Sequence, residues 1–216
     1  MHSSPHRVSD VMTHAVVAVG REALFKEIVE RMDQWKVSAL PVLEGDGRVI
    51  GVVSEADLLP KEEFRDSDPD RFTQLRRLSD MAKAGGVRAE ELMSAPAVTV
   101  HADATLAEAA RIMALRNVKR LPVVNAEGLL EGVVSRSDLL KVFLRPDNDL
   151  ADDIRRDVVD VLFPDPVEPV HIMVTEGVAT LTGRVPDASR IPLAVRLVRG
   201  VEGVVGVDCR LTASDE

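Results

Sequence analysis

Two segments of the chain share the pattern Gly-Val-Val-Ser-x-x-Asp, in which an apolar run ends at a Ser and an Asp follows three residues later. The pattern gives two pairs, Ser54 with Asp57 and Ser135 with Asp138. A helix that begins at such a Ser presents free N–H groups and a positive dipole end, which suit a phosphate. The carboxylate can accept hydrogen bonds from ribose hydroxyls. The residue types and their spacing therefore indicate two candidate nucleotide-binding sites.

The same two pairs also have a purely structural explanation. A Ser at the N-cap of a helix and an Asp at the third helical position satisfy amides that would otherwise lack partners. Capping alone would account for the pattern. One Ser can serve both purposes, so capping and ligand binding are compatible.

The elements that carry these pairs belong to an internal repeat. Residues 11–59 and 92–140 align without a gap at a constant shift of 81, and 18 of the 49 aligned positions are identical. Such similarity indicates one supersecondary unit made twice. We therefore expect a pseudo-symmetric pair of repeats with the functional sites between them.

Each copy predicts the order strand, helix, strand, strand, helix. In the first copy an apolar run at 16–19 is followed by apolar residues at helical spacing over 24–35 and by a predicted hairpin, with strands at 39–43 and 48–54. The second copy repeats the plan. Strands that alternate with helices predict an α/β (α+β) fold, with small sheets covered by helices.

A connector of about residues 61–88 separates the two copies. Leu75, Leu78, Met81 and Ala82 recur at near-helical spacing in it. The pattern favours a connecting helix that packs on the core through this stripe. A lid or a partner surface is the alternative that the sequence leaves open.

After Leu144 the chain changes pattern and predicts a separate α-β-β-α-β domain over residues 150–213. We expect helices at 152–162 and 189–199 and strands at 170–174, 178–185 and 204–211. The acidic cluster at 147–153 lacks the Gly and Glu of a calcium-binding loop. Acidic residues at a helix start, where they complement the dipole, are the favoured interpretation.

Composition limits the function classes. The net charge of −9, the absence of Tyr and the single Trp argue against a nucleic-acid binder. The single cysteine, Cys209, excludes an intramolecular disulfide, and no apolar stretch is long enough to span a membrane. We expect a cytoplasmic location. The histidines lack metal-ligand spacing and no enzyme motif is present, so we expect neither a metal site nor catalytic residues.

The Gly-x-x-Ser-x-x-Asp endings, the Leu-Pro-Val strands and the Met-Thr or Met-Ser openings together resemble a tandem pair of cystathionine-β-synthase (CBS) domains, the Bateman module. The resemblance covers residues 8–144, with one domain at 8–60 and the other at 89–145. It implies two β-α-β-β-α units packed through their sheets, a homodimer, and adenine-containing ligands in two clefts between the repeats.

The resemblance also assigns roles to individual residues. It implies that Ser54 and Ser135 contact phosphate or ribose, and that Asp57 and Asp138 contact the ribose hydroxyls. The residues that open the two repeats line the same clefts; they are Thr13 and Ser94.

The two clefts are expected to differ in charge. Lys119, Arg120 and Arg136 stand near the second motif in sequence, whereas the residues 81 positions earlier are Ser38, Ala39 and Glu55. Cations favour phosphate, and Arg can bind it in a bidentate way. We therefore predict that the cleft around Ser135 and Asp138 is the better nucleotide site. The alternative is that these cations are solvated surface charges.

The C-terminal segment resembles a BON domain, a small module often linked to phospholipid or membrane-associated partners. The resemblance rests on residues 174–185 and on the later run 201–207. For this domain we favour a protein partner over lipid, because the sequence shows neither a basic amphipathic helix nor a lipidation signal.

Taken together, these features predict a non-catalytic regulatory protein. Its CBS pair would bind an adenine nucleotide such as AMP, ADP or ATP, or S-adenosylmethionine, as a regulatory ligand and not as a required cofactor. The signal would reach a protein partner of unknown identity through dimer geometry or the BON domain. The alternative is a ligand-free dimerisation or interaction scaffold with BON-mediated protein or phospholipid association.

Overall fold

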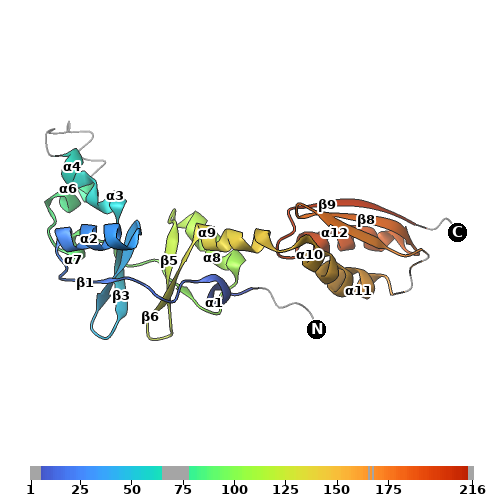
Figure 1. Ribbon diagram of the computed structural model, residues 1–216, viewed down its shortest axis with the longest axis horizontal. Coiled ribbons are helices and arrows are strands. Elements are labelled where there is room, and N and C mark those ends of the chain that lie inside the picture. The colour runs from blue at the N-terminus through green and yellow to red at the C-terminus, as the bar shows by residue number, and fades with distance from the viewer. Residues whose placement is uncertain (1–5, 65–77, 165, 167, 214–216) are drawn as a thin grey trace. The chain divides into compact units, whose positions relative to one another are not determined.

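The computed structural model describes residues 6–64, 78–164, 166 and 168–213 (Figure 1). By their contacts the residues divide into two units. One unit is Arg7–Arg136, and the other combines Ser137–Glu216 with Met1–His6. The first repeat and the second up to Arg136 lie in the first unit, and the α-β-β-α-β domain lies in the second together with the segment that leads to it from Ser137.

The first repeat forms a three-stranded sheet in the order β1-β2-β3, in which β1 is parallel and β3 antiparallel to β2. Its elements are β1 (Val19–Gly20), α2 (Phe25–Trp35), β2 (Ala39–Glu44), β3 (Arg48–Ser54) and α3 (Glu55–Leu58). On α2, Ile28 and Met32 are buried one turn apart, as the apolar spacing predicts. The helix ends at Lys36, which has the left-handed φ of 51°.

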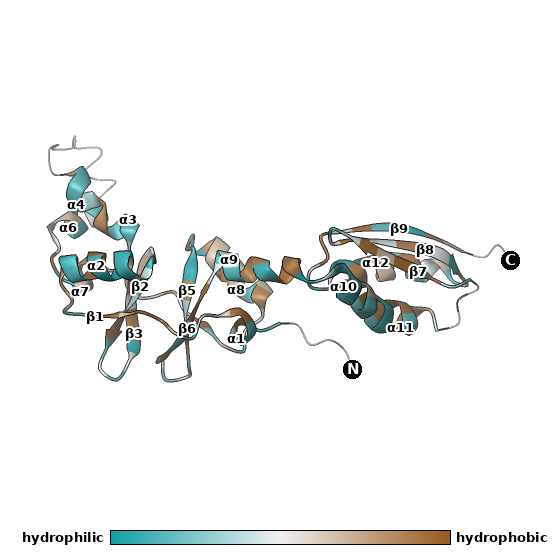
Figure 2. Ribbon diagram, viewed as in Figure 1, coloured by the Kyte–Doolittle hydropathy of each residue, from teal (hydrophilic) through white to brown (hydrophobic). Residues whose placement is uncertain are grey.

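The second repeat has the same topology in the order β4-β5-β6. Its elements are β4 (Val100–His101), α8 (Leu106–Leu115), β5 (Arg120–Val124), β6 (Leu130–Ser135) and α9 (Arg136–Leu140), which is followed by the 3₁₀ turn η1 (Lys141–Leu144). Asn117, 81 residues after Lys36, also ends its helix with a positive φ. The predicted fold class is therefore confirmed. Hydrophobic residues (brown) are concentrated in the strands (Figure 2).

The two repeats exchange their opening segments. Each repeat is preceded by one helical turn, α1 (Val8–Val11) or α7 (Ala89–Leu92). After α1, Thr13 pairs with Val133 of the second repeat; after α7, Ser94 pairs with Val52 of the first repeat. Figure 1 accordingly shows α1 beside β6 and α7 beside α2. Each sheet is thus completed by a segment that precedes the other repeat's helix.

This exchange corrects the predicted first strand. We expected a strand over residues 16–19, but β1 begins only at Val19. The backbone up to Thr13 hydrogen-bonds to Val133, so the intervening residues carry the chain from one sheet to the other.

The exchange also explains a glycine in each copy of the repeated motif. A Cβ on Gly132 would lie 2.8 Å from Met12 Sδ and 3.0 Å from the Thr13 carbonyl oxygen. A Cβ on Gly51 would likewise collide with Met93. The Met of each opening segment therefore packs over the Gly of the other repeat, and a side chain there has no room.

The connector contains α4 (Pro60–Glu63) and α6 (Leu78–Gly85). The Lys61 ammonium donates to the Ala84 carbonyl oxygen at 3.0 Å and lies 5.4 Å from the centre of the Phe25 ring. These contacts join α4 to α6 and to the first repeat. Of the predicted apolar stripe, Leu75 lies outside the described residues.

The C-terminal domain has a sheet in the order β7-β8-β9, in which β7 is antiparallel and β9 parallel to β8. Its elements are α10 (Asp147–Ile154), the π-helical turn η2 (Arg155–Val159), α11 (Asp160–Leu162), β7 (His171–Thr175), β8 (Val178–Val185), η3 (Ala188–Arg190), α12 (Ile191–Arg199) and β9 (Gly206–Ala213). The helical segment from α10 to α11 and the helix α12 cover the same face of the sheet (Figure 1). They bury Ala179 and Leu181 of β8.

The first helix of this domain begins at Asp147, five residues before the predicted start. Pro146 occupies the N-cap, a position where its missing N–H costs nothing. The Asp147 carboxylate accepts hydrogen bonds from the amides of Glu176 and Gly177, at 3.0 and 2.9 Å. The acidic cluster therefore includes a residue that fastens the helix start to the β7–β8 turn.

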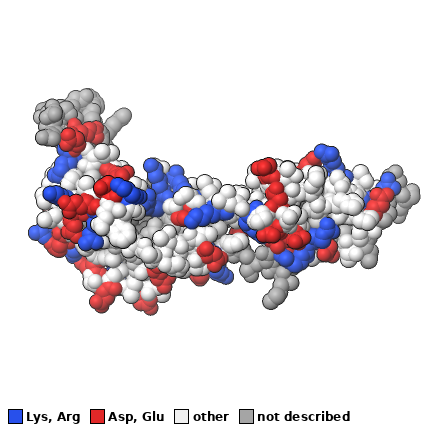
Figure 3. All heavy atoms as spheres, in the orientation of Figure 1, with Lys and Arg blue, Asp and Glu red and all other residues white. Residues whose placement is uncertain are grey.

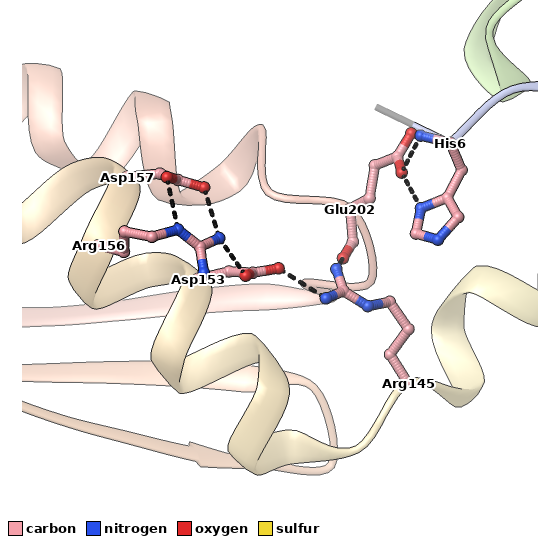
Figure 4. Close-up of polar contacts among 6 residues, drawn as sticks. All are labelled: His6, Arg145, Asp153, Arg156, Asp157 and Glu202. Atoms are coloured by element: carbon pink, nitrogen blue, oxygen red, sulfur yellow. Dashed lines mark hydrogen bonds and ion pairs between the residues drawn. The ribbon is translucent and has the colours of Figure 1, made fainter. Parts of the chain in front are cut away.

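A buried carboxylate completes the domain (Figure 4). Asp153 accepts hydrogen bonds from Arg145, at 2.6 Å, and from Arg156. Burial raises the pKa of Asp153, but the hydrogen bonds from the two guanidinium groups outweigh it and hold the pKa below its ordinary value. Arg145 also donates to the Glu202 carbonyl oxygen, and the Glu202 carboxylate binds His6. The network ties His6 and the loop between α12 and β9 to α10.

Candidate functional site

A pocket of about 290 Å³ lies between the two repeats, close to the lower size range of small-molecule sites. It is lined by Ser38, Ala39, Val52, Ser54, Glu55, Ala56, Asp57, Ser94, Pro96, Ala97, Val98, Asn117, Val118, Lys119 and Arg120. The lining combines an apolar surface of small side chains with hydroxyl, carboxylate and cationic groups. Such a surface suits a ligand with one flat apolar part and one polar or anionic part.

The first Ser-Asp pair forms one side of this pocket. Asp57 Oδ2 accepts hydrogen bonds from the Ser54 amide, at 2.8 Å, and from the Ser54 hydroxyl, at 2.6 Å. The helix-capping interpretation of Asp57 is therefore confirmed. The same carboxylate belongs to the pocket lining, so its capping role does not remove it from the site.

The other carboxylate oxygen of Asp57 contacts two further segments. Asp57 Oδ1 accepts a hydrogen bond from Ser94 Oγ at 3.1 Å and forms an ion pair with Lys83 of α6. Lys83 also donates to Ser94 Oγ at 2.9 Å. The strand end, the exchanged opening segment and the connector therefore meet at one carboxylate.

Lys119 and Arg120 lie near both motifs, because Arg120 pairs with Ser135 in the β5–β6 ladder and the Lys119 carbonyl oxygen accepts from the Arg136 amide. Both line the pocket of Ser54 and Asp57, and Arg120 Nη2 donates to Ser38 Oγ at 2.7 Å. The reason is that the first residues of β2 and β5 both line this pocket, so residues 81 positions apart share it. Of the three cations on which the predicted preference for the second cleft rests, Lys119 and Arg120 thus also line the first pocket. The preference itself stays a prediction.

The second motif has different surroundings. The Asp138 carboxylate pairs with Lys141, three residues later, at 2.8 Å. Arg136 Nε donates to the Val118 carbonyl oxygen at 3.2 Å. The Arg136 amide donates to the Lys119 carbonyl oxygen. Thr13 pairs with Val133 on the strand that ends at Ser135. The opening residues are therefore assigned crosswise, with Ser94 at the first motif and Thr13 on the strand of the second.

Lys83 contacts two residues of the pocket lining, Asp57 and Ser94, and sequence reasoning did not identify it. It lies in the connector and has no counterpart in the repeat alignment, so comparison of the copies could not find it. The helical stripe in the connector was the only signal, and it pointed to packing. Lys83 reaches Asp57 because α6 contacts α3, a contact between segments 26 residues apart.

Charges of both signs are interspersed over the face shown in Figure 3. Among the residues that the structure describes, no group of three or more His, Cys, Asp or Glu could hold a metal ion. No helix within these same residues is long and apolar enough to cross a membrane. The pocket is thus the strongest candidate site, and its chemistry is that of binding an anionic, partly apolar ligand.

Relatives of known sequence and structure match the repeats. An uncharacterised protein of Methanocaldococcus jannaschii is 27% identical over 153 residues, which covers 63% of this chain and 90% of that protein. The chloroplastic CBS domain-containing protein CBSX2 of Arabidopsis thaliana is 29% identical over 132 residues and is covered over 55% of its length, as is this chain. A crystal structure of CBSX2 in complex with AMP has a TM-score of 0.57 at 27% identity and covers 64% of this chain and 97% of that chain.

Family profiles identify both parts of the chain. The CBS domain profile matches residues 8–61 and 89–145, more than half of the chain, and the BON domain profile matches residues 146–215. Both resemblances expected from the sequence are confirmed. The chain therefore belongs to the CBS domain family, as a CBS pair that is followed by a BON domain.

Proposed function

We propose that this protein is a regulatory sensor that binds an adenine nucleotide in the pocket of Ser54 and Asp57. The observation that carries the proposal is the convergence, in one pocket, of a carboxylate and two cations from opposite repeats. Asp57 is suited to ribose hydroxyls, and Lys119 and Arg120 are suited to phosphate. The solved complex of the relative CBSX2 with AMP supports this ligand class.

The apolar part of the lining supplies a place for the base. Val52, Val98 and Val118 line the pocket together with Pro96 and Ala97. Small apolar groups contact a flat ring without competing for its polar edges. Ligand orientation would then follow from the polar groups, which are few and lie on defined backbone segments.

Regulation follows if the ligand binds one arrangement of the repeats better than another. Ser54 ends β3 of the first repeat and Ser94 belongs to the segment that opens the second, so a ligand that contacts both links the two repeats. A ligand shifts an equilibrium only through its difference in affinity for two states. We propose that the BON domain transmits this difference to a protein partner, and that a ligand-free interaction scaffold is the competing function.

Isothermal titration calorimetry with AMP, ADP, ATP, S-adenosylmethionine and GMP tests the proposal. We expect an adenine nucleotide to bind the wild type, Asp57→Asn to weaken that binding at least tenfold, and Asp138→Asn to change it less than threefold. The two variants remove the same charge from matched positions, and melting curves verify that both fold. If no adenine compound binds at millimolar concentration, the scaffold function replaces the sensor.

The same titrations show which of the two motifs binds the nucleotide. If Asp138→Asn abolishes binding and Asp57→Asn leaves it unchanged, the nucleotide occupies the second motif, as the sequence comparison predicted. Thr13, Ser135 and Arg136 would then be the residues to test.

We further propose that the protein is a homodimer. Leu140, Phe143 and Leu144 are large apolar side chains with exposed fractions of 60%, 51% and 81% on one short segment. Exposed apolar clusters are typical of protein interaction surfaces. Light scattering of the full chain should give a dimer mass, and Phe143→Ser should lower it towards the monomer; a monomeric wild type would overturn this proposal.

A further inference from the structure

The acceptor positions of the Asp57 carboxylate are all taken by protein groups. A carboxylate offers about four lone-pair positions. Asp57 Oδ2 accepts from the amide and hydroxyl of Ser54, and Oδ1 accepts from Ser94 Oγ and Lys83 Nζ. A ribose diol therefore cannot be added to this carboxylate without the loss of an existing partner.

The partners differ in how easily they can leave. The Ser54 amide belongs to the backbone at the start of α3, so it stays in place. The Ser94 hydroxyl can rotate towards other acceptors. The Lys83 side chain has four rotatable bonds, so its ammonium can move several ångströms without any change in the backbone. Lys83 is thus the partner that a ribose hydroxyl replaces at lowest cost.

Displacement of Lys83 leaves a cation that needs a new partner. The Lys83 side chain is only 17% exposed and Asp57 is 12% exposed, so the pair is largely shielded from water. An ammonium that loses its counter-ion in such surroundings is destabilised unless another anion replaces it. A phosphate on the ligand can supply that anion. An uncharged nucleoside cannot.

We infer that Lys83 is a specificity-determining residue that makes the pocket select phosphorylated nucleotides over unphosphorylated nucleosides. The inference rests on the proposed function and adds the ligand class that the pocket accepts. Lys83 pairs with the Asp57 carboxylate until a ribose hydroxyl takes its place, and it then pairs with the phosphate of the ligand. The connector helix α6 thereby senses whether a phosphate is present.

Calorimetric titration of the full chain with AMP and with adenosine tests the role of Lys83. We expect the wild type to bind AMP much more tightly than adenosine. In Lys83→Met, AMP binding should weaken about tenfold while adenosine binding stays equal or improves, because the competitor for Asp57 is gone and the phosphate partner is lost. Lys83→Arg should retain most of the preference for AMP.

A matched control separates this effect from a general loss of positive charge. Lys26→Met removes a cation from α2 whose side chain is 87% exposed and that does not line the pocket. It should leave the ratio of the two dissociation constants unchanged. Melting curves show whether each variant is folded, and Lys83→Gln provides a second substitution if Lys83→Met does not fold.

Two results would overturn the inference, and each is distinct from failure of the proposed function. Equal weakening of AMP and adenosine in Lys83→Met means that Lys83 only supports the fold of the site. Unchanged binding of both ligands in Lys83→Met means that ribose does not displace Lys83. Absence of all adenine binding to the wild type overturns both the proposed function and the inference.

Discussion

Asp57 and Asp138 occupy the same position in the two copies of one motif, yet each pairs with a cation of different origin. The partner of Asp57 is Lys83, which comes from the connector and is 17% exposed. The partner of Asp138 is Lys141, which comes three residues later and is 58% exposed. The first pair joins two segments and both of its side chains are shielded, whereas the second pair is local and only its lysine is largely exposed. The two copies of the motif therefore hold their carboxylates beside cations that differ in origin and exposure.

The two repeats also share one pocket, so residues at matching positions do not lie in separate clefts. Aligned residues such as Ala39 and Arg120 do not serve separate clefts, since both line the same pocket. The exchanged opening segments likewise assign Ser94 to the first motif. A cation in one copy can therefore contribute to the pocket that holds the motif of the other copy.

The largest expected effect tests the packing of the exchanged segments. Gly51→Ala and Gly132→Ala should each destabilise the CBS pair by about 1–3 kcal/mol, as overpacked core substitutions do. Gly132→Ala should be the more severe, because its new Cβ meets the backbone oxygen of Thr13 as well as Met12. Urea unfolding followed by circular dichroism measures both. Equal wild-type stability in both variants would show that the Met contacts are loose.

The next effect tests the assignment of the cations. Arg120→Met should weaken AMP binding about tenfold, because a charge-assisted contact to phosphate is lost. Arg136→Met should change it less than threefold, since Arg136 donates to a carbonyl oxygen of the neighbouring segment. Titration of both variants ranks the clefts independently of the carboxylates. A larger loss in Arg136→Met would restore the ranking that the sequence comparison favoured.

The smallest expected effect concerns Glu91, which caps the start of the helical turn α7. Hydrogen bonds from the amides of Val87 and Arg88 lower the pKa of Glu91 below its ordinary value. Because the pKa is lower in the folded state, ionised Glu91 stabilises the fold above the ordinary carboxyl pKa of about 4.3. This stabilisation is lost as the pH falls through the folded-state pKa.

Glu91→Gln should therefore lower the melting temperature on the order of 1–2 °C at pH 7, and less at pH 3. Asp10→Asn is the matched substitution, because Asp10 accepts a hydrogen bond from the Arg7 amide in the equivalent turn. A difference between wild type and Glu91→Gln that grows as pH falls would contradict the assigned direction of the shift.

Local patterns predicted most of the elements, and long-range contacts explain what they missed. The apolar spacing of Ile28 and Met32 specifies a helix because it depends on neighbours within two turns. The exchange that pairs Thr13 with Val133 joins residues 120 positions apart, so no local pattern reveals it. The BON helix start was missed because a Pro-Asp sequence serves equally as a helix break and as a helix beginning.

The candidate site divides in the same way. Ser54 and Asp57 could be found, since the motif is short and occurs twice. The partner cation Lys83 could not, because its position depends on how the connector folds back on α3. Lys119 and Arg120 were found near the second motif, but their place in the lining of the first pocket was missed, since sequence distance does not show which strand ends line the same pocket.

The crossed opening segments have a consequence for how the chain acquires its structure. Neither repeat holds all the parts of its own sheet, so an isolated copy would present an unfilled surface over Gly51 or Gly132. Formation of the two halves is thus expected to be cooperative, with closure delayed until residues far apart in the chain have met. A single repeat expressed alone would satisfy the same contacts by trading segments with a second molecule, which is the geometry of a domain swap.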